Sequence, residues 1–225
     1  MGRIRRALQV PAPQRHVPTP EPTPERFARA LPVLRQEARS WLPPVGETWD
    51  EQMTLFAAQC AGLKADFFLC DNLAEVKERL AALAAVSHWQ RIAAHPGEMT
   101  DACTAALALP TLMTHSGYDM TALETCDAAL TQCDALVAQT GSVLVTSRSA
   151  GGRTLSALAP HHVVLARREQ LVPDLTAAFA LLTERYGADY PSLMSFITGP
   201  SRTGDIERIL VLGAHGPKAL TIFCV

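Results

Sequence analysis

Short apolar runs alternate with segments of helical character through the middle of this chain, and this alternation restricts the fold more than any other feature. The strand-like runs are 65–70, 89–94 and 111–114, and the segments between them, 73–86 and 101–109, have helical patterns. Short buried strands separated by helices are typical of a mostly parallel sheet with helices packed on it. The sequence therefore predicts an α/β fold.

The segment that precedes this pattern has a different composition. Residues 1–23 are rich in proline, which removes backbone donors and favours extended geometry. We interpret them as a flexible arm, with a strap around a partner chain as the alternative. Thr23 followed by Pro24 is typical of a helix start. We therefore expect an N-terminal helical extension over 24–47 and the α/β domain over 48–225.

Local signals mark the starts of two helices inside the domain. Thr48 and Glu51 have the spacing of a capping box, which predicts a helix over 50–62. Asn72 is expected to cap the helix at 73–86, because its side chain can accept from a free N–H group of the first turn.

The next group of strands lacks full helices between its members. The runs 135–138, 143–146 and 162–166 are strand-like, and short polar segments join them. Such links favour a hairpin-like insertion in the sheet. A strong helix is predicted to follow at 173–186, because its apolar residues recur at helical spacing.

Composition excludes several classes of function. The chain has 225 residues, of which 48% are hydrophobic, and a formal net charge of -2. These values suit one globular domain with an appended arm and give no basic excess for nucleic-acid binding. No apolar run is long enough to span a membrane, and the N-terminus lacks the apolar region of a signal peptide. We infer a cytoplasmic protein.

The cysteines indicate buried thiols rather than metal ligands. No pair has the close spacing of a zinc or iron–sulfur ligand set. Most lie among alanine, leucine and phenylalanine, as small buried hydrophobic residues do. We therefore predict that this chain binds no metal and carries no iron–sulfur cluster or other cofactor of its own. The six cysteines are Cys60, Cys70, Cys103, Cys126, Cys133 and Cys224.

The most informative stretch is 195–218, where apolar runs are interrupted by two Gly-Pro breaks. The first break is Gly199-Pro200, and the second closes the segment 213–217. Gly-Pro pairs commonly mark the ends of strands. An apolar tail, 219–225, follows and is expected to form a final strand.

The polar residues after the first break suggest a binding corner. Ser201 or Thr203 is expected to cap a helical turn that contains Asp205. The free N–H groups of such a turn, together with Arg202, would suit an anion.

This stretch resembles the C-terminal signature of the lactate-utilisation protein C family, the LUD domain, which reads GPSRTxDIExxLVxGxHGP before a final apolar strand. A second block, 133–174, resembles the same family. The resemblance covers about 48–225 and is concentrated in these two blocks. It implies a NagB/RpiA/CoA-transferase-like arrangement of the α/β fold.

Three loops are expected to form the ligand site. In open α/β sheets, ligands bind beyond the carboxyl ends of the strands. The loops 139–142, 148–156 and 199–205 could meet there and hold a small carboxylate- or phosphate-bearing ligand. No residue is assigned a catalytic role. The candidate ligand-binding residues are Gln139, Thr140, Gly141, Ser142, Arg153, Gly199, Pro200, Ser201, Arg202, Thr203, Asp205 and His215.

Each loop also has a purely structural interpretation. The segment 140–142 is typical of a tight turn. Arg153 suits a solvated loop charge, and Arg202 could form a salt bridge to Asp205. The family usually has an acidic residue where this chain has Gln139, and glutamine cannot act as a general base.

The histidines near these loops have limited roles. His161 and His162 open a predicted strand, so their side chains should face opposite sides of the sheet. At most one of them can therefore face the crevice. A lone turn histidine such as His215 is more often structural than catalytic.

The resemblance also implies a function. Lactate-utilisation C proteins take part in the oxidation of L-lactate to pyruvate with two companion proteins that carry iron–sulfur clusters. We therefore expect a cytosolic subunit or accessory protein of such a complex. Two alternatives stay open: a stand-alone small-molecule-binding enzyme of the cyclo-ligase or CoA-transferase kind, and a non-catalytic scaffold of the complex.

Overall fold

The computed structural model describes residues 42–114, 119–187, 189–203, 211–212 and 216–225. Pro43–Val225 forms one compact unit. The expected arm at 1–23 and residues 24–41 of the expected helical extension at 24–47 lie outside the described residues. Within the described part, no helix is both long and apolar enough to cross a membrane.

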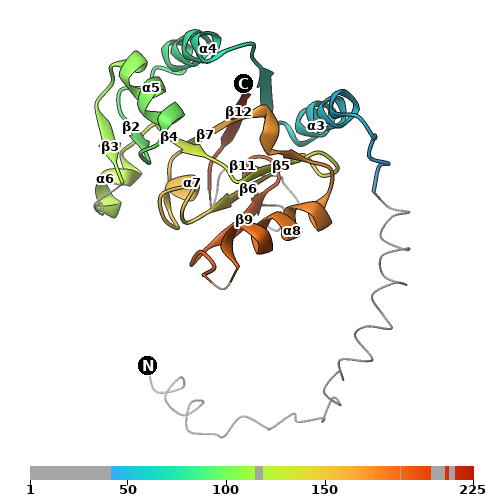
Figure 1. The fold of residues 1–225 in the computed structure, drawn as a ribbon. Coiled ribbons are helices and arrows are strands. Elements are labelled where there is room, and N and C mark those ends of the chain that lie inside the picture. The colour runs from blue at the N-terminus through green and yellow to red at the C-terminus, as the bar shows by residue number, and fades with distance from the viewer. Residues whose placement is uncertain (1–41, 115–118, 188, 204–210, 213–215) are drawn as a thin grey trace, which may run out of the picture. The chain divides into compact units, whose positions relative to one another are not determined.

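A six-stranded parallel sheet forms the centre of this unit, with the strand order β1-β12-β7-β4-β2-β3 (Figure 1). This arrangement confirms the α/β class and the mostly parallel sheet. The strands are β1 (Asp66–Leu69), β2 (Ile92–Ala94), β3 (Thr111–Met113), β4 (Ala128–Gln132), β7 (His161–Ala166) and β12 (Ala219–Cys224).

Strand β4 was not predicted from the sequence, although it lies between β7 and β2. Ala128, Ala129 and Leu130 are fully buried. Alanine has little strand propensity of its own. Close packing on both faces of the sheet explains why small residues fit here, and this packing leaves no local pattern in the sequence.

One face of the parallel sheet is covered by α4 (Leu73–Val86) and α5 (Glu98–Leu107). Asn72 caps α4 as predicted, because its side chain accepts from the N–H of Glu75 at 3.1 Å. Leu80 of α4 packs in the same core cluster as Phe223 of β12. The last strand of the chain is thereby fixed on this side.

The opposite face packs against a second sheet and against α3 (Trp49–Leu63). The capping box of Thr48 and Glu51 is present as predicted. The second sheet has four strands in the order β8-β5-β6-β9. These strands are β5 (Ala135–Val137), β6 (Ser142–Thr146), β8 (Leu171–Val172) and β9 (Met194–Ile197).

Shorter helices and α8 complete the layers. Helix α8 (Leu175–Tyr186) packs on the outer face of the second sheet. The short helices α6 (Met120–Glu124) and α7 (Leu155–Leu158) form a smaller core with β2 and β4. The second sheet therefore lies between α8 and the parallel sheet.

The predicted hairpin insertion is half correct. Strands β5 and β6 do form an antiparallel hairpin, but it belongs to the second sheet. Strand β7, at the predicted run 162–166, belongs to the parallel sheet. The prediction failed because sequence periodicity identifies strands without identifying the sheet into which each one is paired.

A predicted helical turn that begins at Ser201 is wrong. Arg202–Thr203 forms a short strand, β10, which pairs antiparallel with β11 (Val211–Leu212). The N–H of Ser201 donates to the carbonyl of Pro217 at 2.9 Å, so it is not free to bind an anion. The alternative turn, capped by Thr203 and containing Asp205, lies outside the described residues and stays a prediction.

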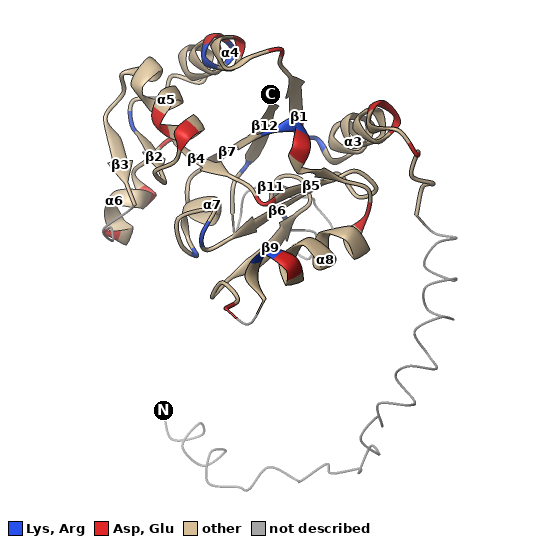
Figure 2. Cartoon of the chain, in the orientation of Figure 1, with Lys and Arg blue, Asp and Glu red and all other residues tan. Residues whose placement is uncertain are grey.

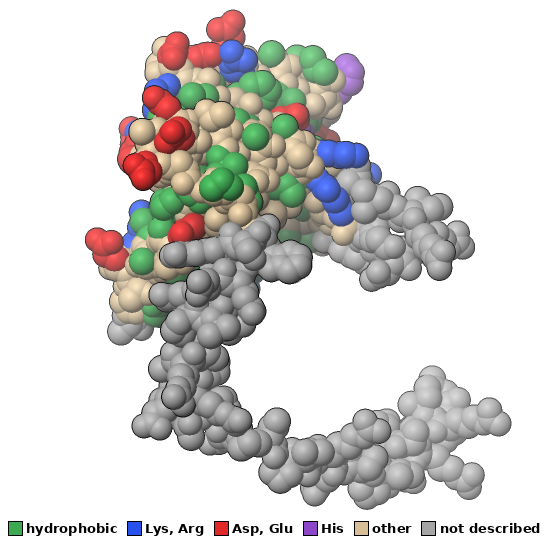
Figure 3. Space-filling model, turned by 90° about the vertical axis from the view of Figure 1, so that its right-hand side faces the viewer, with side chains coloured by type: hydrophobic (Ala, Val, Ile, Leu, Met, Phe, Trp, Pro, Cys, Tyr) green, Lys and Arg blue, Asp and Glu red, His purple; other side chains and the backbone are tan. Residues whose placement is uncertain are grey.

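Charged residues are spread over many elements of the described part (Figure 2). One face has hydrophobic side chains in the middle, acidic and basic side chains together on the left and at the top, and a further group of basic side chains on the right (Figure 3).

A buried carboxylate joins α8 to the start of the β5–β6 hairpin. Asp134 is 2% exposed and accepts at Oδ1 from Tyr186 Oη at 2.5 Å and from Arg185 Nη1 at 2.9 Å. Burial, followed by the hydrogen bond to Asp134, raises the pKa of Tyr186. Both donors lie in the last turn of the helix, so this contact fixes the C-terminal end of α8 on the second sheet.

We predict that Tyr186→Phe lowers the free energy of unfolding by about 2 kcal/mol, because a buried charged acceptor loses a donor. Tyr190→Phe is the matched control, since Tyr190 is 45% exposed and donates to Thr183 at the surface. It should change stability by less than about 0.5 kcal/mol. Chemical denaturation of both variants tests this, and equal effects would contradict it.

Candidate functional site

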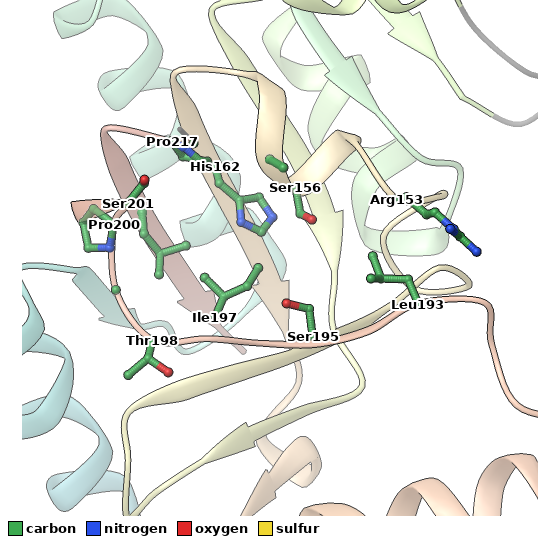
Figure 4. Close-up of a pocket in the computed structure, with 14 residues that line it drawn as sticks. Arg153, Ser156, His162, Leu193, Ser195, Ile197, Thr198, Pro200, Ser201 and Pro217 are labelled. Atoms are coloured by element: carbon green, nitrogen blue, oxygen red, sulfur yellow. The ribbon is translucent and has the colours of Figure 1, made fainter. Parts of the chain in front are cut away.

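A pocket of about 320 Å³ lies between the two sheets (Figure 4). This volume is at the lower end of the roughly 300–1,000 Å³ typical of small-molecule sites. Strands β7 and β12 form one wall, β9 forms the opposite wall, and α7 contributes from the side. The described lining residues are Arg153, Ser156, Ala157, His162, Leu193, Ser195, Ile197, Thr198, Gly199, Pro200, Ser201, Gly216, Pro217 and Leu220.

The alternation of side chains along β9 builds one wall of the pocket. Ser195 and Ile197 face the pocket. Phe196, between them, faces the core beneath α8. This arrangement follows from the period of two in an extended strand.

The two Gly-Pro breaks meet at one end of the pocket. Gly199 has φ +85°, which favours glycine, and a Cβ there would lie 3.0 Å from the carbonyl oxygen of Leu63. A Cβ on Gly216 would lie 3.0 Å from the Cβ of Ser201. Because Ser201 also donates to Pro217, the two loops are held directly against each other.

The pocket lies at a different edge of the sheet from the one predicted. We expected the ligand loops beyond the carboxyl ends of the strands. His162 and Leu220, however, are each the second residue of a parallel strand, so the pocket adjoins the amino ends of β7 and β12. The second sheet explains the difference, because it covers one face of the parallel sheet and brings β9 over these ends.

The two adjacent histidines face opposite sides of β7, as predicted. His161 packs edge-on against Trp89, and its Nε2 is 2.8 Å from the Thr221 hydroxyl. His162 faces the pocket, and its Nε2 is 2.9 Å from the hydroxyl of Thr131 on β4. His162 is therefore the one histidine of the pair that lines the candidate site.

Burial keeps His162 neutral. The side chain is 1% exposed, and desolvation, followed by the nearby His161, lowers the pKa of His162 from 6.5 to about 3. An imidazole that stays neutral at physiological pH offers hydrogen bonds without a positive charge. It is therefore suited to polar recognition rather than to attraction of an anion.

The structure brings some predicted site residues to the pocket. Arg153, Gly199, Pro200 and Ser201 line it. Arg153 is exposed and lies at one end of the pocket, while Pro200 and Ser201 lie at the other (Figure 4).

The predicted loop 139–142 has the contacts of a tight turn instead. Gly141 has φ +64° and donates to the carbonyl of Val137 at 3.0 Å. The side chain of Gln139 donates to the carbonyl of Pro43 at 3.0 Å, and Pro43 is not a lining residue. Neither residue lines the pocket.

The hydroxyl groups of this turn still connect to the pocket. Thr140 donates to Ser142 at 2.8 Å, and the hydroxyl of Ser142 is 2.7 Å from that of Thr198. Thr198 lines the pocket. Thr140 and Ser142 can therefore orient a lining hydroxyl without themselves forming the wall.

Of the remaining predicted residues, Arg202 is not among the described lining residues. Arg202 is exposed on β10, and Thr203 is the other residue of that strand. Asp205 and His215 lie outside the described residues. A ligand contact by Arg202 therefore stays a prediction.

Sequence reasoning missed several lining residues. Ser195 comes from β9 and Leu220 from β12. Ser156 belongs to the predicted site loop 148–156, although it was not named as a candidate residue. Strand alternation could have indicated Ser195, because it shares a face with Ile197. Nothing local indicates that Leu220, in the last strand, lies opposite β9.

The cysteines are buried, as predicted. All six are free thiols with buried side chains. Burial raises the pKa of Cys60 and Cys224 to about 12 and that of Cys103 to about 11, so these thiols stay protonated at neutral pH. Among the residues that the structure describes, no group of three histidine, cysteine or acidic side chains could hold a metal ion.

Comparison with protein families identifies the family of the domain that contains this pocket. Residues 112–225 match the family model of the LUD domain. The chain belongs to the LUD domain family. All fourteen described lining residues fall within the matched region, so the pocket is a feature of the LUD domain itself.

Related proteins carry the name lactate utilization protein C. The one from Anoxybacillus flavithermus is 36% identical over 104 residues, which are 46% of each chain. The one from Geobacillus thermodenitrificans is 41% identical over 83 residues, or 36% of this chain and 35% of that one. The one from Exiguobacterium is 28% identical over 189 residues, or 80% of each. The chain thus spans less than half the length of the first two relatives.

A solved structure shares the fold of this LUD domain. It is the crystal structure of a DUF162 family protein from Deinococcus radiodurans, with a TM-score of 0.61 and 18% identity. The match covers 80% of this chain and 99% of that one.

The depressed pKa of His162 predicts an acid-sensitive fold. In the unfolded chain the His162 side chain binds a proton with a pKa near 6.5, whereas in the folded chain its pKa is about 3. The free energy of unfolding therefore decreases as the pH falls from about 6.5 to about 3. His162→Gln should make this loss shallower. Ser195→Ala, which changes the same pocket without removing a titratable group, should not. Melting temperatures as a function of pH test this, and parallel curves for wild type and His162→Gln would contradict it.

Proposed function

We propose that this protein is a component of an L-lactate-oxidising system, in which lactate is converted to pyruvate together with iron–sulfur partner proteins. Its own contribution is to bind an organic anion in the pocket between the two sheets. Three observations support the proposal: the relatives are named for lactate utilisation, the chain contains a LUD domain, and a pocket with hydroxyl groups and an arginine lies within that domain.

The main support for a ligand site is that both sequence blocks that resemble the family contribute residues to the same pocket. Arg153, Ser156 and His162 come from the block 133–174, whereas Ser195 and the two Gly-Pro loops come from the C-terminal block. Residues that are far apart in the sequence thus form one pocket. The pocket has the composition of a small-molecule site, since its walls are mainly apolar and carry a few polar groups.

The redox groups are proposed to lie on the partner proteins. Oxidation of lactate removes two electrons and two protons, so an electron acceptor is required. The thiols of this chain are buried and protonated, which makes them poor cluster ligands. We expect the chain, purified alone without oxygen, to contain no stoichiometric iron, and iron analysis tests this.

The function is tested by reconstitution. Lactate-dependent dye reduction should be measured with the iron–sulfur partners alone, with the partners plus this protein, and with this protein alone. We expect activity only when all components are present. Activity of the partners alone at the full rate would contradict the proposal, and activity of this protein alone would favour the stand-alone enzyme.

A charge variant tests the contribution of the pocket. Arg153→Gln should lower lactate-dependent activity about tenfold, because a charge-assisted hydrogen bond to the anion is lost. Arg79→Gln is the matched control, since Arg79 forms an exposed ion pair with Glu75 on α4. Full activity of well-folded Arg153→Gln would instead indicate a scaffold, in which complex formation matters and the pocket does not.

A further inference from the structure

His162 has an unsatisfied hydrogen-bonding atom at the wall of the pocket. Its Nε2 interacts with the Thr131 hydroxyl, but its Nδ1 is buried and has no partner among the described residues. Buried polar atoms in folded proteins almost always have a partner. An orphaned atom on a residue that lines a pocket therefore indicates a group that a ligand supplies.

The Thr131 hydroxyl decides which kind of partner this atom requires. Among the described residues, this hydroxyl has no hydrogen bond other than the one to His162. If Nε2 carried the proton, both the buried hydroxyl hydrogen of Thr131 and the Nδ1 lone pair would lack partners. If Thr131 donates to Nε2, only one group is left unsatisfied, the N–H at Nδ1. The tautomer with its proton on Nδ1 is therefore favoured. In this form the neutral His162 side chain offers an N–H donor to an oxygen acceptor of the ligand.

The charge of the pocket restricts the ligand further. Arg153 is the one charged side chain among the described lining residues, and none of those residues is acidic. It lies at one end of the pocket (Figure 4). An acidic group of the ligand is therefore expected at this end, while the neutral imidazole meets an uncharged oxygen.

The size and the walls of the pocket indicate a ligand larger than lactate. The volume of about 320 Å³ corresponds to roughly ten water molecules. Leu193, Ile197, Pro200, Pro217 and Leu220 give the pocket apolar walls. A three-carbon acid would leave most of these walls without contact, whereas a longer molecule with an apolar body would cover them.

We propose that the pocket binds an elongated organic anion, larger than lactate, whose uncharged carbonyl oxygen accepts from His162 Nδ1–H and whose acidic group lies beside Arg153. This inference rests on the proposed function, because it takes the pocket to be the ligand site of the LUD domain. It assigns that site to a carbonyl-bearing organic cofactor or acyl compound, and not to the substrate lactate.

The tautomer is tested first on the unmodified protein. The ¹⁵N chemical shifts of a neutral imidazole distinguish a protonated nitrogen from an unprotonated one. We expect the proton of His162 on Nδ1 in the ligand-free protein at neutral pH. A proton on Nε2 would overturn the proposal, whatever the variants described next show.

Matched probe molecules test the ligand class. β-Benzoylpropionate carries a carboxylate, an apolar ring and a separate carbonyl, and γ-phenylbutyrate lacks only the carbonyl. Calorimetric titration of the wild-type protein should show about tenfold tighter binding of the benzoyl compound, the value of one buried hydrogen bond. Pyruvate and lactate should bind more weakly than either probe. Equal affinities of the two aromatic acids, or no binding of the benzoyl compound at millimolar concentration, would overturn the proposal.

Two variants assign the preference to the named residues. His162→Gln should abolish the preference for the carbonyl compound, because glutamine can keep the contact to Thr131 but loses the donor at the Nδ1 position. His161→Gln is the matched control, since its side chain faces away from the pocket, and it should retain the preference. A preference that persists in folded His162→Gln would contradict the assignment.

The role of the charge is tested by the amide of β-benzoylpropionate. The wild-type protein should prefer the acid to the amide by about tenfold, and Arg153→Gln should remove this difference. Equal affinities of the wild-type protein for the acid and the amide would contradict the proposal that the ligand has an acidic group beside Arg153. These titrations use the isolated protein, so their failure is distinguishable from failure of the lactate-dependent reconstitution.

Discussion

The packing of the second sheet on one face of the parallel sheet is the constraint on which the pocket depends. The core between the sheets contains Val164 and Ile222 from the parallel sheet and Val143 from the second one. Leu220 belongs both to this core and to the pocket lining. The pocket is thus the continuation of a dry core, at the point where serine, threonine and histidine side chains replace apolar ones. Such a position shields hydrogen bonds from water and strengthens them.

The features that sequence reasoning predicted correctly are local ones. Thr48 and Asn72 cap their helices because a side chain can reach the first turn only a few residues away. The opposite orientations of His161 and His162 follow from strand geometry alone. The Gly199-Pro200 break identified one end of the pocket, because a Gly-Pro pair restricts the backbone wherever it occurs.

The features that were missed depend on contacts between distant segments. Strand β4 is alanine-rich because both of its faces are covered, which no local pattern reveals. The second sheet draws on segments from Ala135 to Ile197 and therefore could not be assigned from periodicity. A helical turn beginning at Ser201 was predicted wrongly, because Arg202 and Thr203 pair with Val211 and Leu212 instead of forming local hydrogen bonds. The unsatisfied nitrogen of His162 became apparent only once Thr131 was placed beside it.

The central claim is that His162 recognises an uncharged carbonyl oxygen of an organic anion. The most direct measurement is a crystal structure of the protein with β-benzoylpropionate bound. The account predicts the carbonyl oxygen within about 3 Å of His162 Nδ1 and the carboxylate directed to Arg153. A probe bound outside the space between the two sheets, or bound inside it with its carbonyl directed away from His162, would contradict the claim.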